Sequence, residues 1–264
     1  MEFWLLYLLT GVFAGFLAGL LGVGGGLVIV PVLTFIFTAQ HFPHEHILHV
    51  ALGTSLASIM FTSFSSLRAH HAHGAVNWTV VRGITPGIVA GTLAGTVLAA
   101  QLSTNFLKVF FVVFVYYVAA QMLLNIKPKP ARQLPGMGGM FGAGSVIGGV
   151  SSLVGIGGGT LSVPFMTWCN IKMHQAIGTS AAIGFPIAAA GALGYVVNGL
   201  GAAGLPQYSL GFIYLPALAG LVFASVLTAP FGARMAHRLP VPQLKKVFAA
   251  LLIVLGTRML ASLF

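Results

Sequence analysis

The sequence predicts an all-α integral membrane protein made of two inverted-topology repeats. Charged residues are only 5% of the 264 residues and hydrophobic residues are 58%. A soluble domain carries about a quarter charged residues, so the composition argues against that class. Apolar runs of about 20 residues recur along the chain, long enough to cross a hydrocarbon layer of roughly 30 Å as helices. The third observation is a glycine-rich motif that occurs once in each half of the chain.

The two motifs match almost position by position. Residues 22–31 are GVGGGLVIVP and residues 155–164 are GIGGGTLSVP, so the glycines, one valine and the final proline coincide. Each motif lies between two apolar runs, and a glycine cluster is a place where a helix breaks. We therefore expect each half to start with a long helix, a break and a short helix.

The remaining elements follow in the same order in both halves. The first half has long apolar segments at 3–21, 49–67, 78–100 and 106–126, with a short piece at 27–37. The second half has them at 136–154, 174–197, 210–231 and 242–263, with a short piece at 160–171. This predicts eight long transmembrane helices plus two short broken-helix segments, giving eight to ten crossings. The predicted domains are a first repeat (1–126), a cytoplasmic linker rich in charge and proline (127–135) and a second repeat (136–264).

Basic residues predict that the two repeats have opposite orientations. Arg68 and Arg82 flank one connection of the first repeat, whereas the equivalent connection of the second repeat, 198–209, carries no Lys or Arg. In the second repeat, the basic residue Arg234 instead marks the connection that follows the segment 210–231. Short basic loops face the cytoplasm, so equivalent loops lie on opposite sides of the membrane. This arrangement predicts a multi-pass membrane protein with both termini on the outer side of the membrane. Membrane orientation also explains the net charge of +10 better than nucleic-acid binding does.

The glycine motifs are the predicted substrate site. Neither follows a strand nor ends in Gly-Lys-Ser/Thr, so a nucleotide loop is excluded. Matching helix breaks in inverted repeats point to a transporter's binding site, and the free N–H groups of the two short helices suit an anion. The alternative is that the glycines only allow close helix packing.

Hydroxyl groups on the next helix of each half complete this site. Residues 49–55 (HVALGTS) and 174–180 (HQAIGTS) are identical at five of seven positions, and their hydroxyls could donate to an oxyanion or bond back to the helix. Ser58, Thr62 and Ser65 continue on one face in the first repeat only, where they could line a path. The predicted substrate-binding residues are Gly24, Gly25, Gly26, Thr54, Ser55, Gly157, Gly158, Gly159, Thr160, Gly178, Thr179 and Ser180.

Titratable residues restrict the mechanism. Glu2 and Glu45 are the only carboxylates in the chain, which argues against a cation pump with intramembrane acids. His49 and His174 recur in both repeats and are the candidates for proton coupling. Six of the other seven histidines cluster in two loops (His41, His44 and His46; His70, His71 and His73), at loose spacings and without cysteine partners, so we expect no metal site and no cofactor.

These features resemble the sulfite exporter TauE/SafE (TSUP) family: two Gly-rich motifs ending in Val-Pro, a Gly-Thr-Ser on the following helix, and two related halves. The resemblance implies a bacterial inner-membrane permease for small, often sulfur-containing anions such as sulfite, thiosulfate, sulfoacetate and related organosulfonates. In that membrane the two outer termini would lie in the periplasm. We expect a secondary transporter coupled to the proton gradient and not an enzyme, because no catalytic constellation is present. A passive anion channel and a divalent-metal permease are the alternatives. The expected partners are the anion and the lipid bilayer, not nucleic acid, with a homodimer left open.

Overall fold

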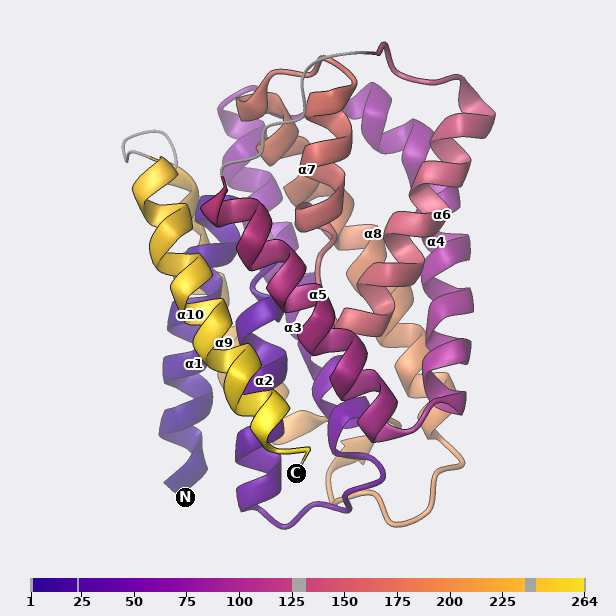
Figure 1. Ribbon diagram of the computed structural model, residues 1–264, viewed down its shortest axis with the longest axis vertical. Coiled ribbons are helices and arrows are strands. Elements are labelled where there is room, and N and C mark those ends of the chain that lie inside the picture. The colour runs from indigo at the N-terminus through magenta and orange to yellow at the C-terminus, as the bar shows by residue number, and fades with distance from the viewer. Residues whose placement is uncertain (1, 23, 125–131, 236–240, 264) are drawn as a thin grey trace.

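The computed structural model describes residues 2–22, 24–124, 132–235 and 241–263, and this part of the chain is almost entirely helical (Figure 1). The helices of the first half are α1 (Glu2–Leu21), α2 (Gly26–Ala39), α3 (Ile47–Ala72), α4 (Trp78–Gln101) and α5 (Thr104–Leu123). Those of the second half are α6 (Met137–Val154), α7 (Gly159–Trp168), α8 (Met173–Gly199), α9 (Leu215–Met235) and α10 (Val241–Ala261). Two short strands, β1 (Ser209–Leu210) and β2 (Ile213–Tyr214), pair antiparallel just before α9.

The lengths of these helices confirm the prediction of an all-α integral membrane protein, whereas its division into two inverted repeats stays a prediction. Within the described residues, seven helices (α1, α3, α4, α5, α6, α8 and α9) are long and apolar enough to cross a membrane. The short helices α2 and α7 have 14 and 10 residues. Helix α10 has 21 residues but is not among the seven, so the eight long crossings stay a prediction.

Each long helix that precedes a glycine motif forms a hairpin with the short helix after it. Gln40, which follows α2, donates from Nε2 to the hydroxyl of Tyr7 near the start of α1 at 2.9 Å. At the other hairpin, the N–H of Arg132 donates to the carbonyl oxygen of Trp168 at the end of α7. Each hairpin therefore begins and ends at one end of the bundle, and Figure 1 shows that the two hairpins open at opposite ends.

Helices of the first half pack mainly against helices of the second half. Helix α1 lies along α9, α4 along α6, α3 along α8, and α5 along α10. Small residues let these backbones approach closely. A Cβ on Gly15 would lie 2.5 Å from the carbonyl oxygen of Ser225, and a Cβ on Gly148 would overlap the carbonyl oxygen of Ile88. Because Gly15 and Gly148 occupy matching positions before the two motifs, the α1–α9 and α6–α4 contacts correspond to each other.

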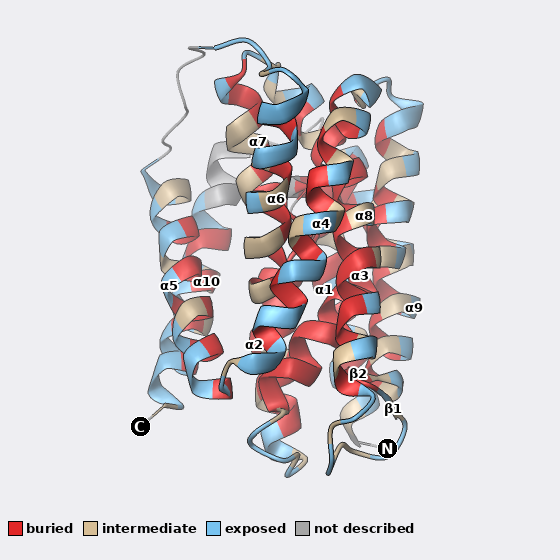
Figure 2. Cartoon of the chain, turned by 90° about the vertical axis from the view of Figure 1, so that its right-hand side faces the viewer, coloured by how far each residue is buried: buried red, intermediate tan, exposed pale blue. Residues whose placement is uncertain are grey.

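The two helices that follow the hairpins form the centre of the bundle. In the most apolar stretch of each helix, 83% of the residues are buried in α3 but only 39% in α4 and in α9. Figure 2 shows the buried residues concentrated on α3 and α8 and the exposed ones on the outer sides of the surrounding helices. The exposed apolar faces of these outer helices are the surface that lipid covers.

Two predicted boundaries are wrong. The basic segment expected as a loop after residue 67 is helical, because α3 continues to Ala72 and only Gly74, with φ +65°, ends it. The helix expected from residue 210 begins at Leu215, because the β1–β2 hairpin turns at Gly211. Residues 127–131 of the expected linker lie outside the described residues, and the repeat boundaries stay predictions.

Candidate functional site: the crossing of the two glycine motifs

The two glycine motifs meet at the middle of the bundle. A Cβ on Gly24 would lie 3.0 Å from the Cα of Gly157, and a Cβ on Gly157 would lie 3.2 Å from the Cα of Gly24. A Cβ on Gly26 would overlap the carbonyl oxygen of Gly155. The contact is therefore between backbones, and any side chain at these positions would push the two halves apart.

Left-handed backbone conformations explain why glycine is needed at the breaks. Gly25 and Gly158 precede α2 and α7 with φ values of +76° in both cases. Gly22 and Gly155, which end the preceding helices, have φ values of +67° and +70°. An L side chain in this region costs about 1–2 kcal/mol. The predicted helix breaks are thus found in both halves, with nearly the same backbone geometry.

The first turns of the two short helices point their positive ends toward this crossing. The carbonyl oxygen of Gly25 accepts from the N–H groups of Val28 and Ile29, and that of Gly158 accepts from Leu161 and Ser162. N–H groups earlier in each first turn have no partner within their own helix. Together with the helix dipole, they make each N-terminus favourable for negative charge.

Two serines hold the motifs in place by reciprocal hydrogen bonds. Ser55 on α3 donates to the carbonyl oxygen of Gly155 at 2.8 Å. The matching Ser180 on α8 donates to the carbonyl oxygen of Gly22 at 3.1 Å and shares its proton with Ile177 of its own helix. In this conformation both serines use their protons on the backbone of the opposite half, so they position the motifs.

The two predicted threonines make a second reciprocal pair of contacts. The hydroxyl oxygen of Thr54 accepts from the N–H of Tyr214, just before α9. That of Thr179 accepts from the N–H of Asn77, just before α4. Gly178 also faces that region, because a Cβ on it would lie 2.6 Å from the carbonyl oxygen of Ala75. These three residues anchor the connections that lead into α4 and α9, away from the glycine crossing.

Three buried hydroxyls near the start of α7 have no hydrogen-bond partner within the part of the chain that the structure describes. They are Ser151, Thr160 and Ser162, and all are at most 5% exposed. Thr160 was predicted as a site residue, and Ser162 follows it in the first turn of α7. Ser151 was missed, although its place one turn before the second glycine motif was a signal. The matching positions of the first half are Ala18, Leu27 and Ile29, so this polarity belongs to the second half.

A narrow crevice lies beside the glycine crossing. It is too narrow to admit a water molecule in this conformation. Three predicted residues line it, Gly24, Gly157 and Ser180, together with Ser63 and Ser66 of α3, which the sequence interpretation missed. The Ser66 hydroxyl is buried and has no hydrogen-bond partner among the described residues. The site is therefore closed in this conformation, with hydroxyls at its wall.

Two residues of the predicted polar stripe of α3, Thr62 and Ser65, contact α9 in this conformation, and a path along the stripe stays a prediction. The Thr62 hydroxyl lies 2.7 Å from that of Ser225, and Ser65 donates to the carbonyl oxygen of Val226. Both partners are on α9, so these side chains join α3 to α9. The hydroxyls that face the crevice, on Ser63 and Ser66, are on the adjacent face of the same helix.

The two candidate histidines lie far from the glycine crossing and differ from each other. His49 is buried in the first turn of α3, where its Nε2 lies 3.0 Å from the carbonyl oxygen of Ala99. His174 is exposed in the first turn of α8. Because α3 and α8 start at opposite ends of the bundle (Figure 1), the two histidines cannot act on one proton at the same place.

No donor set for a metal ion is found in the described part of the chain. Within it, no three or more His, Cys, Asp and Glu side chains come together. Burial raises the pKa of the Cys169 thiol, although the nearby Arg132 lowers it, so the thiolate that a metal would need is disfavoured.

Comparison with known proteins places the chain among membrane transporters. Residues 7–259 match the family described as sulfite exporter TauE/SafE. A probable membrane transporter protein of Haemophilus influenzae is 40% identical over 260 residues, covering 98% of both chains. One of Methanocaldococcus jannaschii is 24% identical over 262 residues, covering 97% of this chain and 94% of the relative. No solved structure matches the chain.

Proposed function

The chain belongs to the sulfite exporter TauE/SafE family of membrane transporters, and we propose that it carries a small anion, sulfur-containing in particular, through the glycine crossing. The observation that carries this proposal is the direct contact of Gly24 with Gly157, where two short helices begin. Sulfite, thiosulfate, sulfoacetate and related organosulfonates are the candidate substrates.

The charges around the crossing favour an anion. Glu45 is exposed in the connection between α2 and α3, and Glu2 is the first residue of α1; the sequence contains no other carboxylate side chain. The crossing thus combines two helix N-termini with buried hydroxyl donors, and neither glycine motif contains an acidic residue. The hydroxyls of Ser151, Thr160 and Ser162 can donate to an oxyanion without giving up a hydrogen bond made by the described residues.

The reciprocal contacts support two repeats of inverted topology. Ser55 bonds to Gly155 as Ser180 bonds to Gly22, and the two hairpins open at opposite ends (Figure 1). The basic residues Arg68, Arg82 and Lys172 lie near the end to which α7 returns, which we assign to the cytoplasm. Both termini then face the other side, the periplasm in an inner membrane.

Binding of the proposed substrates is tested by thermal shift on the purified protein. A ligand at about 100 times its Kd stabilises by about 2.7 kcal/mol, which corresponds to a rise in melting temperature of roughly 5–10 °C for a protein of this size. We expect at least one of sulfite, thiosulfate, sulfoacetate and taurine to give such a shift, with sulfate and lactate as comparison anions. If only Ni²⁺ or Co²⁺ raises the melting temperature, the anion proposal is wrong and a metal permease takes its place.

Coupling to protons is the second part of the proposal and rests on His49 and His174. In proteoliposomes, an inward or outward proton gradient is expected to drive accumulation of the anion. Replacing both histidines by glutamine is expected to abolish this accumulation while leaving exchange of labelled for unlabelled anion. His44→Gln, an exposed histidine outside the helices, is the matched control. Accumulation that survives the double substitution removes the histidines from coupling, and transport indifferent to the gradient in the wild type indicates a passive channel.

A further inference from the structure

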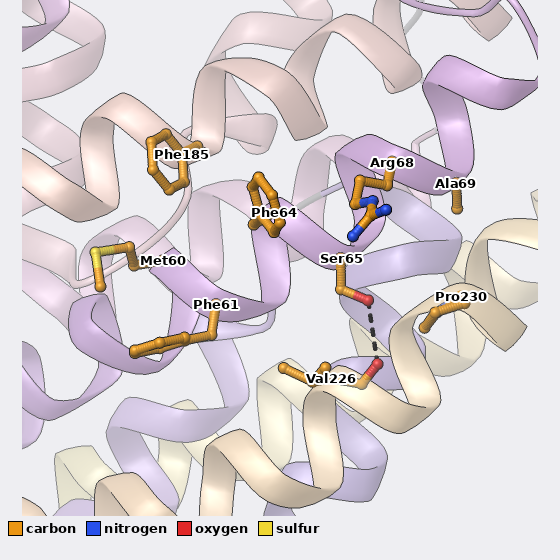
Figure 3. A pocket seen from close by; sticks show the side chains of 9 residues that line it. All are labelled: Met60, Phe61, Phe64, Ser65, Arg68, Ala69, Phe185, Val226 and Pro230. Carbon is orange, nitrogen blue, oxygen red and sulfur yellow. Dashed lines mark hydrogen bonds between the residues drawn. The ribbon is translucent and has the colours of Figure 1, made fainter.

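The outer surface of the bundle has a groove between α3, α8 and α9 that the transport site does not use. Its volume is about 880 Å³. Met60, Phe61 and Phe64 of α3 line it on one side, and Phe185 of α8 on another. Figure 3 shows Met60 and Phe61 at one end of the groove and Arg68 at the other. The distance along α3 from Phe61 to Arg68 is roughly 10 Å, so one groove offers an apolar channel that ends at a cation.

The guanidinium of Arg68 is available at the end of the groove. It makes no hydrogen bond or ion pair with the residues that the structure describes, and its Cζ lies 5.8 Å from the centre of the Phe64 ring. The floor beside it is closed by Ser65, which donates to the carbonyl oxygen of Val226 at 3.1 Å. A guanidinium over an aromatic ring keeps its N–H donors free for an oxyanion such as a phosphate.

The duplicated fold shows that packing does not require this arginine. Counting from the matching Ser55 and Ser180, the position of Arg68 is occupied in α8 by Leu193, and that of Ser65 by Ala190. Leu193 is 60% exposed on the outer surface of the bundle, so the fold accepts an apolar side chain at this position. Arg68 and the polar floor beside it are therefore specific to one side of the membrane.

We propose that this groove binds one anionic phospholipid, with an acyl chain along Phe61, Phe64 and Phe185 and the phosphate on Arg68. Burial of the chain against aromatic rings supplies apolar contact, and the guanidinium selects the charged headgroup. Basic pockets between transmembrane helices at a membrane interface bind anionic headgroups in this way. Neutral lipids share the chain but lack the net negative charge, so they bind the groove more weakly.

The test compares lipids that differ only in the headgroup. The full chain, purified in a neutral detergent, is given dioleoyl phosphatidylglycerol or dioleoyl phosphatidylcholine, and retained lipid is counted by native mass spectrometry. We expect one phosphatidylglycerol per chain to be retained at least about tenfold better than phosphatidylcholine. Arg68→Leu is expected to remove this preference. Arg82→Leu, which removes an exposed arginine at the same end but outside the groove, is expected to keep it.

Two further measurements keep the proposal testable if Arg68→Leu does not fold. Phe185→Ala removes an acyl contact without changing charge, and is expected to weaken retention of phosphatidylglycerol. Glycerol 1-phosphate, a phosphate without acyl chains, is expected not to displace the lipid at equal concentration. The lipid site is overturned if both lipids are retained equally, or if Arg82→Leu loses the preference for phosphatidylglycerol as Arg68→Leu does. It is also overturned if Phe185→Ala retains phosphatidylglycerol as the wild type does. Full displacement of the lipid by glycerol 1-phosphate would instead make the groove a site for a small free anion.

Discussion

Replacing Gly158 by leucine is expected to reduce anion uptake in proteoliposomes by tenfold or more. Gly158 has φ +76°, and a Cβ there would overlap the side chain of Ile187 and lie 3.4 Å from the Ser151 hydroxyl. The positive φ costs about 1–2 kcal/mol wherever it occurs, so the loss of uptake is expected from the collision with Ile187. A displacement of α7 that disfavours the binding geometry by about 1.4 kcal/mol is about tenfold in an equilibrium constant. The larger side chain also moves the start of α7, where the N–H groups for the anion lie.

The control for this substitution separates backbone strain from the loss of the site. Gly74 also has a positive φ, +65°, but a Cβ on it would meet no atom within 4 Å. Gly74→Leu therefore carries a similar backbone cost and no collision, and it is expected to transport close to the wild-type rate. Uptake is compared per reconstituted molecule. If Gly158→Leu and Gly74→Leu show equal uptake, the glycine cluster serves packing only.

The sequence was sufficient to predict the parts of the fold that depend on composition and repetition. A hydrophobic run long enough to span a membrane has few alternatives to a helix, and a repeated glycine cluster marks a break in both halves. Helix boundaries were predicted less accurately where a helix continues through polar residues. His70 and His71 were expected in a loop because they are polar, yet nothing before Gly74 interrupts α3.

The role of the hydroxyls could not be predicted, because their partners are distant in the chain. Ser55 and its partner Gly155 are 100 residues apart, and Ser180 and Gly22 are 158 apart. Helical spacing correctly predicted that Thr62 and Ser65 lie on one side of α3. It could not predict which neighbouring helix that side faces. Only the packing of α3 between α8 and α9 decides that Ser63 and Ser66 face the crevice.

Replacing Ser55 and Ser180 by alanine is expected to lower stability more than it weakens substrate binding. Each substitution leaves a buried carbonyl without its side-chain donor, which costs about 1–3 kcal/mol, or about 0.6 kcal/mol by averages for interhelical bonds in membranes. At roughly 2–4 °C per kcal/mol, a fall in melting temperature of a few degrees is expected for each. The double variant is expected to lose more than the sum, because the two bonds fix the same crossing from opposite sides.

This experiment also separates the two roles that these serines could have. Ser145→Ala is the control, since Ser145 donates only to the carbonyl oxygen of Phe141 in its own helix, and its melting temperature is expected to stay near that of the wild type. If the serines instead donate to the anion, the unliganded variants melt as the wild type does and the KM for uptake rises sharply. A lower melting temperature with a falling maximal rate and a nearly constant KM is what positioning of Gly22 and Gly155 requires, because the loosened motifs spend less time in the geometry that binds and releases the anion.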